Sequence, residues 1–254
     1  MPNIKEPQKE NGGEVKFPIT TAKLSIKDLF AQNNVKKKFK ELMGEKMQGF
    51  ITSILQYISN DELLVKADPY SVYYAAIVAA VLDLPVNRNL GFAYIIPYND
   101  KKSGKCIAQF QIGYKGFIQL AQRSGLFKTI SATPIYEGQI QECNPLTGYK
   151  FDFNKKHSDN IIGYAGYFKL LNGFEKMIYH SCKELKSHGL KYSQSYKKGY
   201  GLWVDDFEAM AMKTIIKSLL SKYAPLSVTM QKAEQLDASI INNEEGTDFI
   251  YVDN

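Results

Sequence analysis

An apolar, alanine-rich run over residues 70–82 constrains the fold more than any other feature of the sequence. Asp68 and Pro69 stand just before it, and this pair is a typical helix start, with aspartate as the N-cap and proline at the first helical position. Because nearly every residue of the run is apolar, we expect a helix that is buried on all sides. The run is too short to cross a bilayer. We therefore expect a core helix of a globular protein that does not enter a membrane.

Hydrophobic patterning predicts the remaining elements. An amphipathic helix is expected over residues 35–59, and a β-hairpin with a basic tip over residues 92–112. Further strands are predicted at residues 129–136, 161–170 and 175–179, further helices at residues 25–31, 114–124, 181–188 and 205–223, and a loop at residues 191–201. Because no βαβ repeat is present, this order predicts an α+β fold in which helices pack on a small antiparallel sheet with β-hairpins.

Glycines and caps mark several of the predicted helix ends. Gly125 and Gly189 are each expected in the left-handed conformation just past the end of a helix. Ser181 and Glu184 have the spacing of a capping box. Asp205 is expected to cap the last long helix.

The charge distribution divides the chain. The sequence carries a net charge of +6, but residues 225–254 hold one lysine and six acids and so carry −5, which leaves +11 for residues 1–224. We expect a flexible arm at residues 1–22, a folded core at residues 23–230 and a flexible acidic tail at residues 231–254. A basic body indicates a polyanionic partner, and we expect the tail to dock a partner protein.

Cysteine usage and the N-terminus indicate the compartment. Cys106, Cys143 and Cys182 are far apart and odd in number, so neither a disulfide framework nor a zinc ribbon is predicted. The N-terminal residues lack the apolar region of a secretory signal. We therefore expect a cytoplasmic protein.

ATP binding has no support in the sequence. The phosphate-binding loop of nucleotide-driven motors requires Gly-x-x-x-x-Gly-Lys followed by serine or threonine. Gly104 and Lys105 are followed by Cys106, and the position five residues before Gly104 is Asn99, so the motif is not matched. This argues against a helicase or an ATP-dependent recombinase.

A metal-dependent nuclease is the enzymatic alternative, because it too would be basic. Such an enzyme needs clustered carboxylates, but Glu184 is explained by its capping box, and Asp205 and Asp206 lie at a helix start, where acids are expected. His180 and His188 flank a short helix without an evident full set of zinc ligands. We expect no catalytic and no metal-binding residues.

Basic and aromatic residues favour the binding of nucleic acid. Lysine and arginine neutralise phosphates, and aromatic rings stack on unpaired bases. Core packing is the alternative role for the single tryptophan, although its glycine-flanked basic loop favours a functional one. The candidate DNA-binding residues are Arg88, Gln109, Gln111, Tyr114, Lys115, Arg123, Lys197, Lys198, Tyr200, Trp203, Lys213, Lys217, Lys36 and Lys37.

Five blocks of the sequence resemble the RecT family of phage and prophage single-strand annealing recombinases. They are LDLPVNRNLGFAYIIPY at residues 82–98, AQFQIGYKGFIQLA at 108–121, PIYEG at 134–138, GYAGYFKL at 163–170 and WVDDFEAMAMKT at 203–214. The blocks occur in order and the resemblance covers about residues 25–230. The N-terminal arm and the acidic tail fall outside it.

The resemblance implies an ATP-independent protein of phage homologous recombination that pairs complementary single strands of DNA within an oligomer or helical filament. It implies no required cofactor, with Mg²⁺ at most a DNA counterion. The implied partners are single-stranded DNA, the annealed duplex intermediate, further copies of the chain, a partner exonuclease and the single-strand-binding protein of the bacterial host.

We hypothesise a basic groove for the DNA. The hairpin and the helix from Tyr114 would form one wall, and the loop at residues 197–203 with the helix of Lys213 and Lys217 would form the other. A metal-dependent nuclease and a protein that coats single strands without pairing them remain the alternatives.

Overall fold

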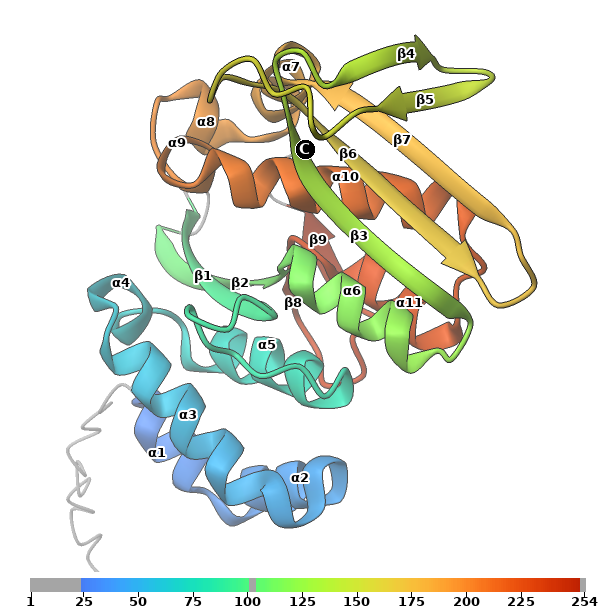
Figure 1. The fold of residues 1–254 in the computed structure, drawn as a ribbon. Helices are drawn as coiled ribbons and strands as arrows, with labels where there is room; N and C mark the ends of the chain where they lie inside the picture. The colour runs from blue at the N-terminus through green and yellow to red at the C-terminus, as the bar shows by residue number, and fades with distance from the viewer. Residues whose placement is uncertain (1–23, 101–103, 252–254) are drawn as a thin grey trace, which may run out of the picture.

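The computed structural model describes residues 24–100 and 104–251, and the arm expected at residues 1–22 lies outside this part. Its N-terminal helices form the base of the molecule in Figure 1. They are α1 (Ile26–Ala31), α2 (Asn33–Met43), a 3-10 turn (Gly44–Lys46), α3 (Met47–Ser59), α4 (Glu62–Val65) and α5 (Pro69–Val81). The single helix predicted over residues 35–59 is wrong. Gly44 has a φ of +55°, a conformation that favours glycine, and α2 ends there before α3 begins.

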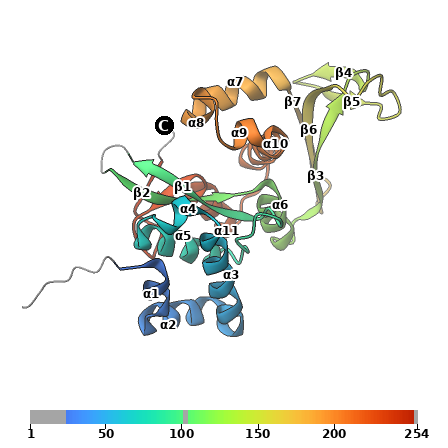
Figure 2. The same ribbon diagram turned by 90° about the vertical axis from the view of Figure 1, so that its left-hand side faces the viewer.

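α5 confirms the predicted core helix. Oδ1 of Asp68 accepts a hydrogen bond from the backbone N–H of Ser71 (3.0 Å), and Pro69 is the first helical residue. Nearly all of its side chains are buried, and it packs beneath the β1–β2 hairpin (Figure 2). None of the helices in the described ranges has both the length and the apolar character needed to cross a membrane.

The first sheet is antiparallel, with the strand order β1-β2-β8-β9. Its strands are β1 (Ala93–Asp100), β2 (Lys105–Ile112), β8 (Ser239–Ile241) and β9 (Phe249–Tyr251). β1 and β2 form the predicted hairpin, in which Ala93 pairs with Ile112 and Asp100 pairs with Lys105.

The C-terminal segment is part of the core, which differs from the flexible tail expected over residues 231–254. α11 (Val228–Leu236) leads into β8, which pairs with β2 and with β9. Leu236 and Ile240 are buried. The acidic composition suggested a solvated tail, but Asp237 is itself buried and paired with cations. The apolar residues between the acids therefore determine how this segment folds.

The second sheet has the strand order β3-β6-β7 and is also antiparallel. Its strands are β3 (Phe127–Tyr136), β6 (Ile161–Leu170) and β7 (Glu175–Ser181), and α10 (Phe207–Tyr223) crosses one face beside α6 (Tyr114–Arg123) (Figure 1). Gly166 permits this close packing, because a Cβ atom there would lie 2.4 Å from Cγ2 of Ile215. These elements confirm an α+β fold with small antiparallel sheets.

A short hairpin extends beyond the second sheet and was missed by the sequence analysis. It consists of β4 (Ile140–Asn144) and β5 (Gly148–Phe151), which pair only with each other among the described strands. Most of its residues are exposed, and the strands are short. The alternation of apolar and polar residues that marks a half-buried strand is therefore absent.

The region after β7 is more helical than predicted. α7 (Cys182–Tyr192) begins at the predicted capping box of Ser181 but continues through Gly189. The end of α7 and the short helix α8 (Gln194–Lys197) occupy much of the expected loop, and α9 (Leu202–Asp205) follows directly after it. Gly189 is therefore not a C-cap. Gly125, in contrast, has the predicted positive φ after α6. The N-cap of α10 is Asp206 rather than Asp205, because Asp206 accepts the hydrogen bond from the N–H of Ala209.

Candidate nucleic-acid interface

A large open groove of about 2020 Å³ lies between two parts of the molecule. β1 and β2 lie on one side, and α7 to α10 lie on the other, as Figure 2 shows. The C-terminal segment from α11 to β9 adds to the first side. The structure brings eight of the candidate DNA-binding residues to this groove: Arg88, Gln109, Gln111, Lys198, Tyr200, Trp203, Lys213 and Lys217.

Arg88 is held from two sides at the edge of the groove. Its Nη2 atom lies 2.5 Å from Oδ2 of Asp61, and its guanidinium carbon lies 5.3 Å from the centre of the Tyr57 ring. The hydroxyl of Tyr57 donates to the carbonyl oxygen of Ile95 in β1 (3.2 Å), and burial raises the pKa of this tyrosine. The Arg88 side chain is still 56% exposed. A pre-positioned guanidinium group of this kind can bind a phosphate through two hydrogen bonds or stack on a base.

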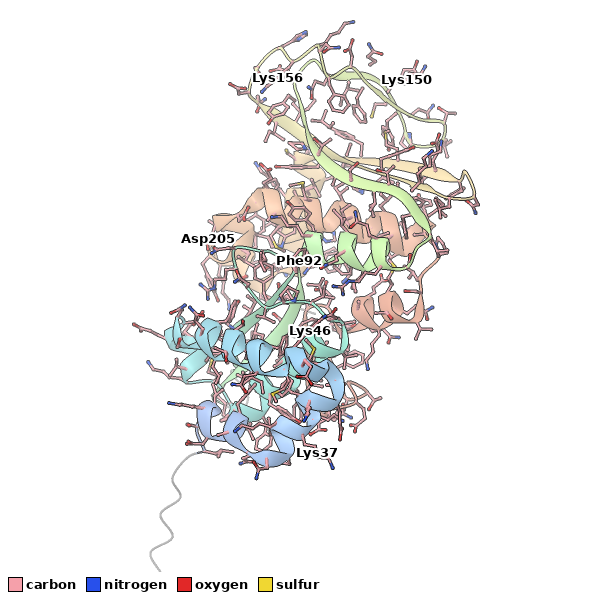
Figure 3. All side chains as sticks on the ribbon, turned by 60° about the horizontal axis from the view of Figure 1, so that its bottom comes forward. Lys37, Lys46, Phe92, Lys150, Lys156 and Asp205 are labelled. Carbon is pink, nitrogen blue, oxygen red and sulfur yellow. The ribbon has the colours of Figure 1, made fainter. Side chains whose placement is uncertain are left out.

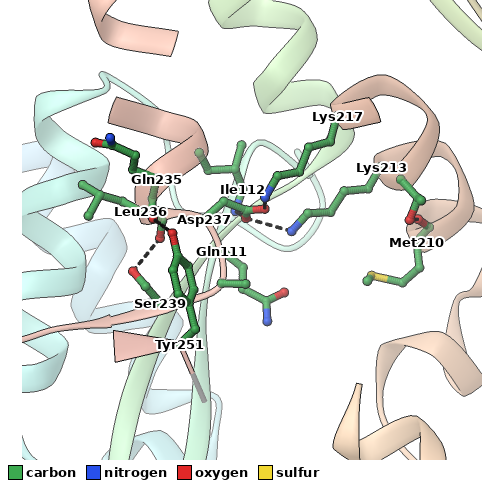
Figure 4. Close-up of polar contacts among 12 residues, drawn as sticks. Gln111, Ile112, Met210, Lys213, Lys217, Gln235, Leu236, Asp237, Ser239 and Tyr251 are labelled. Carbon is green, nitrogen blue, oxygen red and sulfur yellow. Dashed lines mark hydrogen bonds and ion pairs between the residues drawn. The ribbon is translucent and has the colours of Figure 1, made fainter. Parts of the chain in front are cut away.

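Lys213 and Lys217 line the groove and share one carboxylate, that of Asp237 (Figure 4). They project from successive turns of α10, and their Nζ atoms lie 2.8 Å from Oδ1 and 2.8 Å from Oδ2 of Asp237, respectively. Oδ1 also accepts the backbone N–H of Ile112 in β2 (2.9 Å). Burial lowers the pKa of Lys213. Burial alone would raise the pKa of Asp237, but the two ammonium groups hold it below its usual value.

Tyr114 lies at the start of α6, beside a small cavity of about 40 Å³ that shares residues with the groove. Tyr94, Gln111 and Lys213 line both. Burial raises the pKa of Tyr94 and of Tyr114, so both hydroxyls stay protonated at neutral pH. Lys115 is exposed, with its Nζ atom 6.0 Å from the centre of the Tyr114 ring, and lies outside the groove lining.

Gln109 and Arg123 have structural partners. Gln109 is only 3% exposed, and its Nε2 atom donates to the carbonyl oxygen of Ala238 (2.8 Å). It therefore holds the C-terminal segment against β2. Arg123 donates to the carbonyl oxygens of Leu82 and Asp83 (3.1 and 3.0 Å) and so ties α6 to the end of α5, away from the groove.

Trp203 is buried, which differs from its expected role as a stacking surface. It is 7% exposed, and its ring centre lies 5.7 Å from those of Tyr196 and Phe207. Burial of aromatic faces stabilises the fold, and the indole here anchors α9 to α7 and α10. Tyr200, at 57% exposure, is an aromatic ring of this region that is both exposed and part of the groove lining.

Three predicted lysines lie elsewhere. Lys36 and Lys37 are exposed on α2, outside the groove lining. Figure 3 shows Lys37 at the base of the molecule and Asp205, which lines the groove, well away from it. Lys197 is exposed on α8 but does not line the groove either.

The groove is not uniformly basic, which differs from the hypothesis. Among the described residues that line it, seven are acidic and five are lysine or arginine. Helix starts explain part of this balance, since Glu184 completes the capping box of α7 and Asp206 caps α10. Asp61 and Asp237 are paired with cations. The negative charges of these four acids are therefore already stabilised by protein groups, either helix N-termini or cationic side chains.

Sequence reasoning missed several residues of the groove. Tyr94 and Tyr98 in β1 line it, as does the Tyr57–Asp61 pair that holds Arg88. The two strand tyrosines are four residues apart and therefore share one face of β1, a signal that was available in the sequence. Asp237 could not be found this way, because it lies 20 residues or more from the lysines that it contacts.

The acids and histidines near α7 show no metal-site geometry. Glu184 accepts hydrogen bonds from the backbone N–H (2.8 Å) and hydroxyl (2.7 Å) of Ser181, as the capping box predicts. Burial lowers the pKa of His180 and of His188. Within residues 24–100 and 104–251, no group of three or more His, Cys, Asp or Glu is placed to hold a metal ion.

Comparison with known proteins agrees with the resemblance in the sequence. A family model described as "RecT family" matches residues 48–248. YqaK of Bacillus subtilis (strain 168) is 44% identical over 232 residues, which are 91% of this chain and 76% of that protein. The chain belongs to the RecT family. Protein RecT of Escherichia coli (strain K12) is 31% identical to this RecT-family chain over 190 residues, which are 68% of the chain and 65% of that protein.

Family membership gives the groove its context. RecT-family proteins act in phage-type DNA recombination and single-strand annealing, and they are generally not enzymes. The matched region from residue 48 to residue 248 includes both walls of the groove, together with α11 and β8. Residues 231–248, excluded from the resemblance in the sequence analysis, thus lie within the region that the family model matches.

Proposed function

We propose that this RecT-family protein anneals complementary single strands of DNA without ATP, and that the first strand lies in the groove. The groove itself carries this proposal. It presents the cations of Arg88, Lys198 and Lys217 and the rings of Tyr98 and Tyr200. Cations neutralise phosphates and release counterions, whereas aromatic rings stack on any unpaired base. Neither contact depends on base sequence, which suits a protein whose specificity comes from base pairing.

The mixed charge of the groove supports a moderate affinity for single-stranded DNA. A strand that is to anneal must be bound while its bases stay available for pairing. The compensated carboxylates in the walls reduce the cationic potential that a strand meets. The energy that drives annealing then comes from the base pairs of the product, which requires no nucleotide hydrolysis.

Further copies of the chain and other proteins belong to the same proposal. Head-to-tail contacts between copies would give a ring or a filament, so that one strand passes from groove to groove. An exonuclease would supply single strands, and the host single-strand-binding protein would hold them. Mg²⁺ would act as a counterion of the DNA rather than as a reactant.

A pairing assay with two dye-labelled complementary oligonucleotides tests the proposal. The protein is added with Mg²⁺, in the presence and absence of ATP, and both the rate of pairing and the length of the strands are followed. We expect faster pairing without ATP and intact strands. The double variant Arg88→Ala/Lys198→Ala should slow pairing, whereas Lys128→Ala should not, because Lys128 is exposed on β3 outside the groove lining.

The alternatives give different results in this assay. Strands that shorten with Mg²⁺ would indicate a nuclease. Tight binding without faster pairing would indicate a coating protein. Either result contradicts the proposal.

A further inference from the structure

Lys213 is the more buried of the two lysines in the cluster that it forms with Lys217 and Asp237. Its side chain is 11% exposed, whereas that of Lys217 is 33% exposed and that of Asp237 is 2% exposed. Two ammonium groups share a single carboxylate, so the cluster has one positive charge in excess. Lys217 is therefore the most exposed member of the cluster, and all three residues line the groove.

We propose that Lys213 is a positioning residue for DNA binding that acts through Asp237. By occupying Oδ1 of Asp237, it leaves the charge of Lys217 incompletely neutralised, and a DNA phosphate in the groove takes up that charge. This inference rests on the proposed function, since it names one of the charges that a strand meets in the groove.

The carboxylate is the fixed partner in this cluster. Oδ1 of Asp237 accepts the backbone N–H of Ile112, and the next residue, Ala238, donates its N–H to the carbonyl oxygen of Phe110 (3.0 Å). The side chain of Gln109 holds Ala238 a second time. Asp237 therefore cannot follow a lysine toward the DNA.

Lys217 is the mobile partner, because its ammonium group sits on a flexible stem at the open end of the cluster. Without Lys213, the carboxylate would keep only Lys217 and the N–H of Ile112. The pair would then be neutral, and Lys217 would be held by Asp237 rather than offered to a phosphate. Removal of a buried lysine thus weakens a contact that it does not itself make.

Three variants and a salt titration test this coupling. The affinity for a single-stranded oligonucleotide is measured between 50 and 200 mM salt, where each phosphate contact contributes about 0.7 to the slope of log K against log [salt]. We expect Lys213→Met to reduce the slope by about 0.7. The double variant Lys213→Met/Asp237→Asn should restore the wild-type slope, because Lys217 is then free again. Lys217→Met should lower the slope by the same amount, and Lys128→Met is the matched control.

We expect the variants to fold, so that their affinities for DNA can be compared. Lys213→Met leaves Asp237 with two partners, and the double variant removes a buried charge pair together, a change that is often neutral for stability. If Lys213→Met does not fold, the salt slope of the double variant still distinguishes a positioning role of Lys213 from a direct contact with DNA. If Lys213 contacts DNA directly, the salt slope of the double variant should stay about 0.7 lower than that of the wild type.

The results separate the inference from the function on which it rests. A lower slope in Lys213→Met that is restored in the double variant supports the positioning role. Three results would overturn it. They are an unchanged slope in Lys213→Met, an equally reduced slope in Lys213→Met and in the double variant, and an unchanged slope in Lys217→Met. Failure of the wild-type protein to bind or anneal DNA would instead overturn the proposed function.

Discussion

Gly189 lies directly against the indole ring of Trp203. A Cβ atom at Gly189 would come within 2.9 Å of two ring carbons and within 3.0 Å of the Tyr196 ring. This contact joins the middle of α7 to α9, on one wall of the groove. It explains why a glycine stands inside a helix, where glycine is otherwise unfavourable.

The first prediction concerns this contact. Gly189→Ala forces the indole or α7 to shift, and overpacking of this kind costs about 1–3 kcal/mol in the free energy of unfolding. Gly49→Ala is the matched control, since Gly49 lies in α3 with no atom within 4 Å of its added Cβ. That variant should be stabilised by about 0.5–1 kcal/mol. Urea denaturation of both proteins checks the difference in sign, and two equal effects would contradict the packing role of Gly189.

The single tryptophan gives a direct spectroscopic prediction. Because Trp203 is 7% exposed and packed between aromatic rings, its fluorescence should have the short emission wavelength of a buried indole and resist quenching by iodide. Addition of single-stranded DNA should leave this protection unchanged, since the indole faces are covered by protein. Strong quenching by DNA would restore the role as a stacking surface that the sequence suggested.

The sequence predicted most elements correctly where local signals and burial agree. The caps at Asp68 and Ser181 and the hairpin of β1 and β2 have local signals, and the structure confirms them. The break at Gly44 was missed, because the apolar spacing continues on both sides of it. Residues that depend on distant partners could not be predicted, and Asp237 is the main example.

The candidate site shows the same limit. Arg88 and Tyr200 were predicted and do line the groove, because exposed basic and aromatic residues in loops are visible in a sequence. Gln109 and Trp203 also border the groove, but both are buried and have structural partners. Their burial follows from the C-terminal segment and from the contact with α7, neither of which has a local signal.

The folded C-terminal segment leads to a truncation prediction. Removal of residues 237–254 takes away β8 and β9 and leaves the buried Lys213 without its carboxylate. Loss of one partner of a buried ion pair typically costs about 3–5 kcal/mol. We expect little soluble, cooperatively unfolding protein, as measured by thermal denaturation. A truncated protein with wild-type stability that still anneals DNA would show instead that the segment is an appendage, and only then could deletion test its expected docking role.

Arg88 provides a prediction for the groove itself. Arg88→Ala should weaken binding of single-stranded DNA and lower the salt slope by about 0.7. Arg88→Lys should recover the slope but less of the affinity, because lysine lacks the planar fork. Lys128→Ala, outside the groove lining, should match the wild type. If Lys37→Ala lowered the slope while Arg88→Ala did not, the DNA site would lie on α2 rather than in the groove.

The two histidines beside the groove give the protein a predicted loss of stability in mild acid. Burial lowers the pKa of His180 and of His188 from the ordinary value of 6.5, so the unfolded chain binds protons more readily than the folded one. The contribution of these two histidines to the free energy of unfolding should therefore be constant above about pH 7 and fall as the pH drops below 6.5, toward the folded-state pKa values. His188→Gln should reduce this dependence, because glutamine does not titrate. Urea unfolding at pH 8, 7, 6 and 5.5 measures it, and an identical pH dependence in the variant would show that His188 does not contribute.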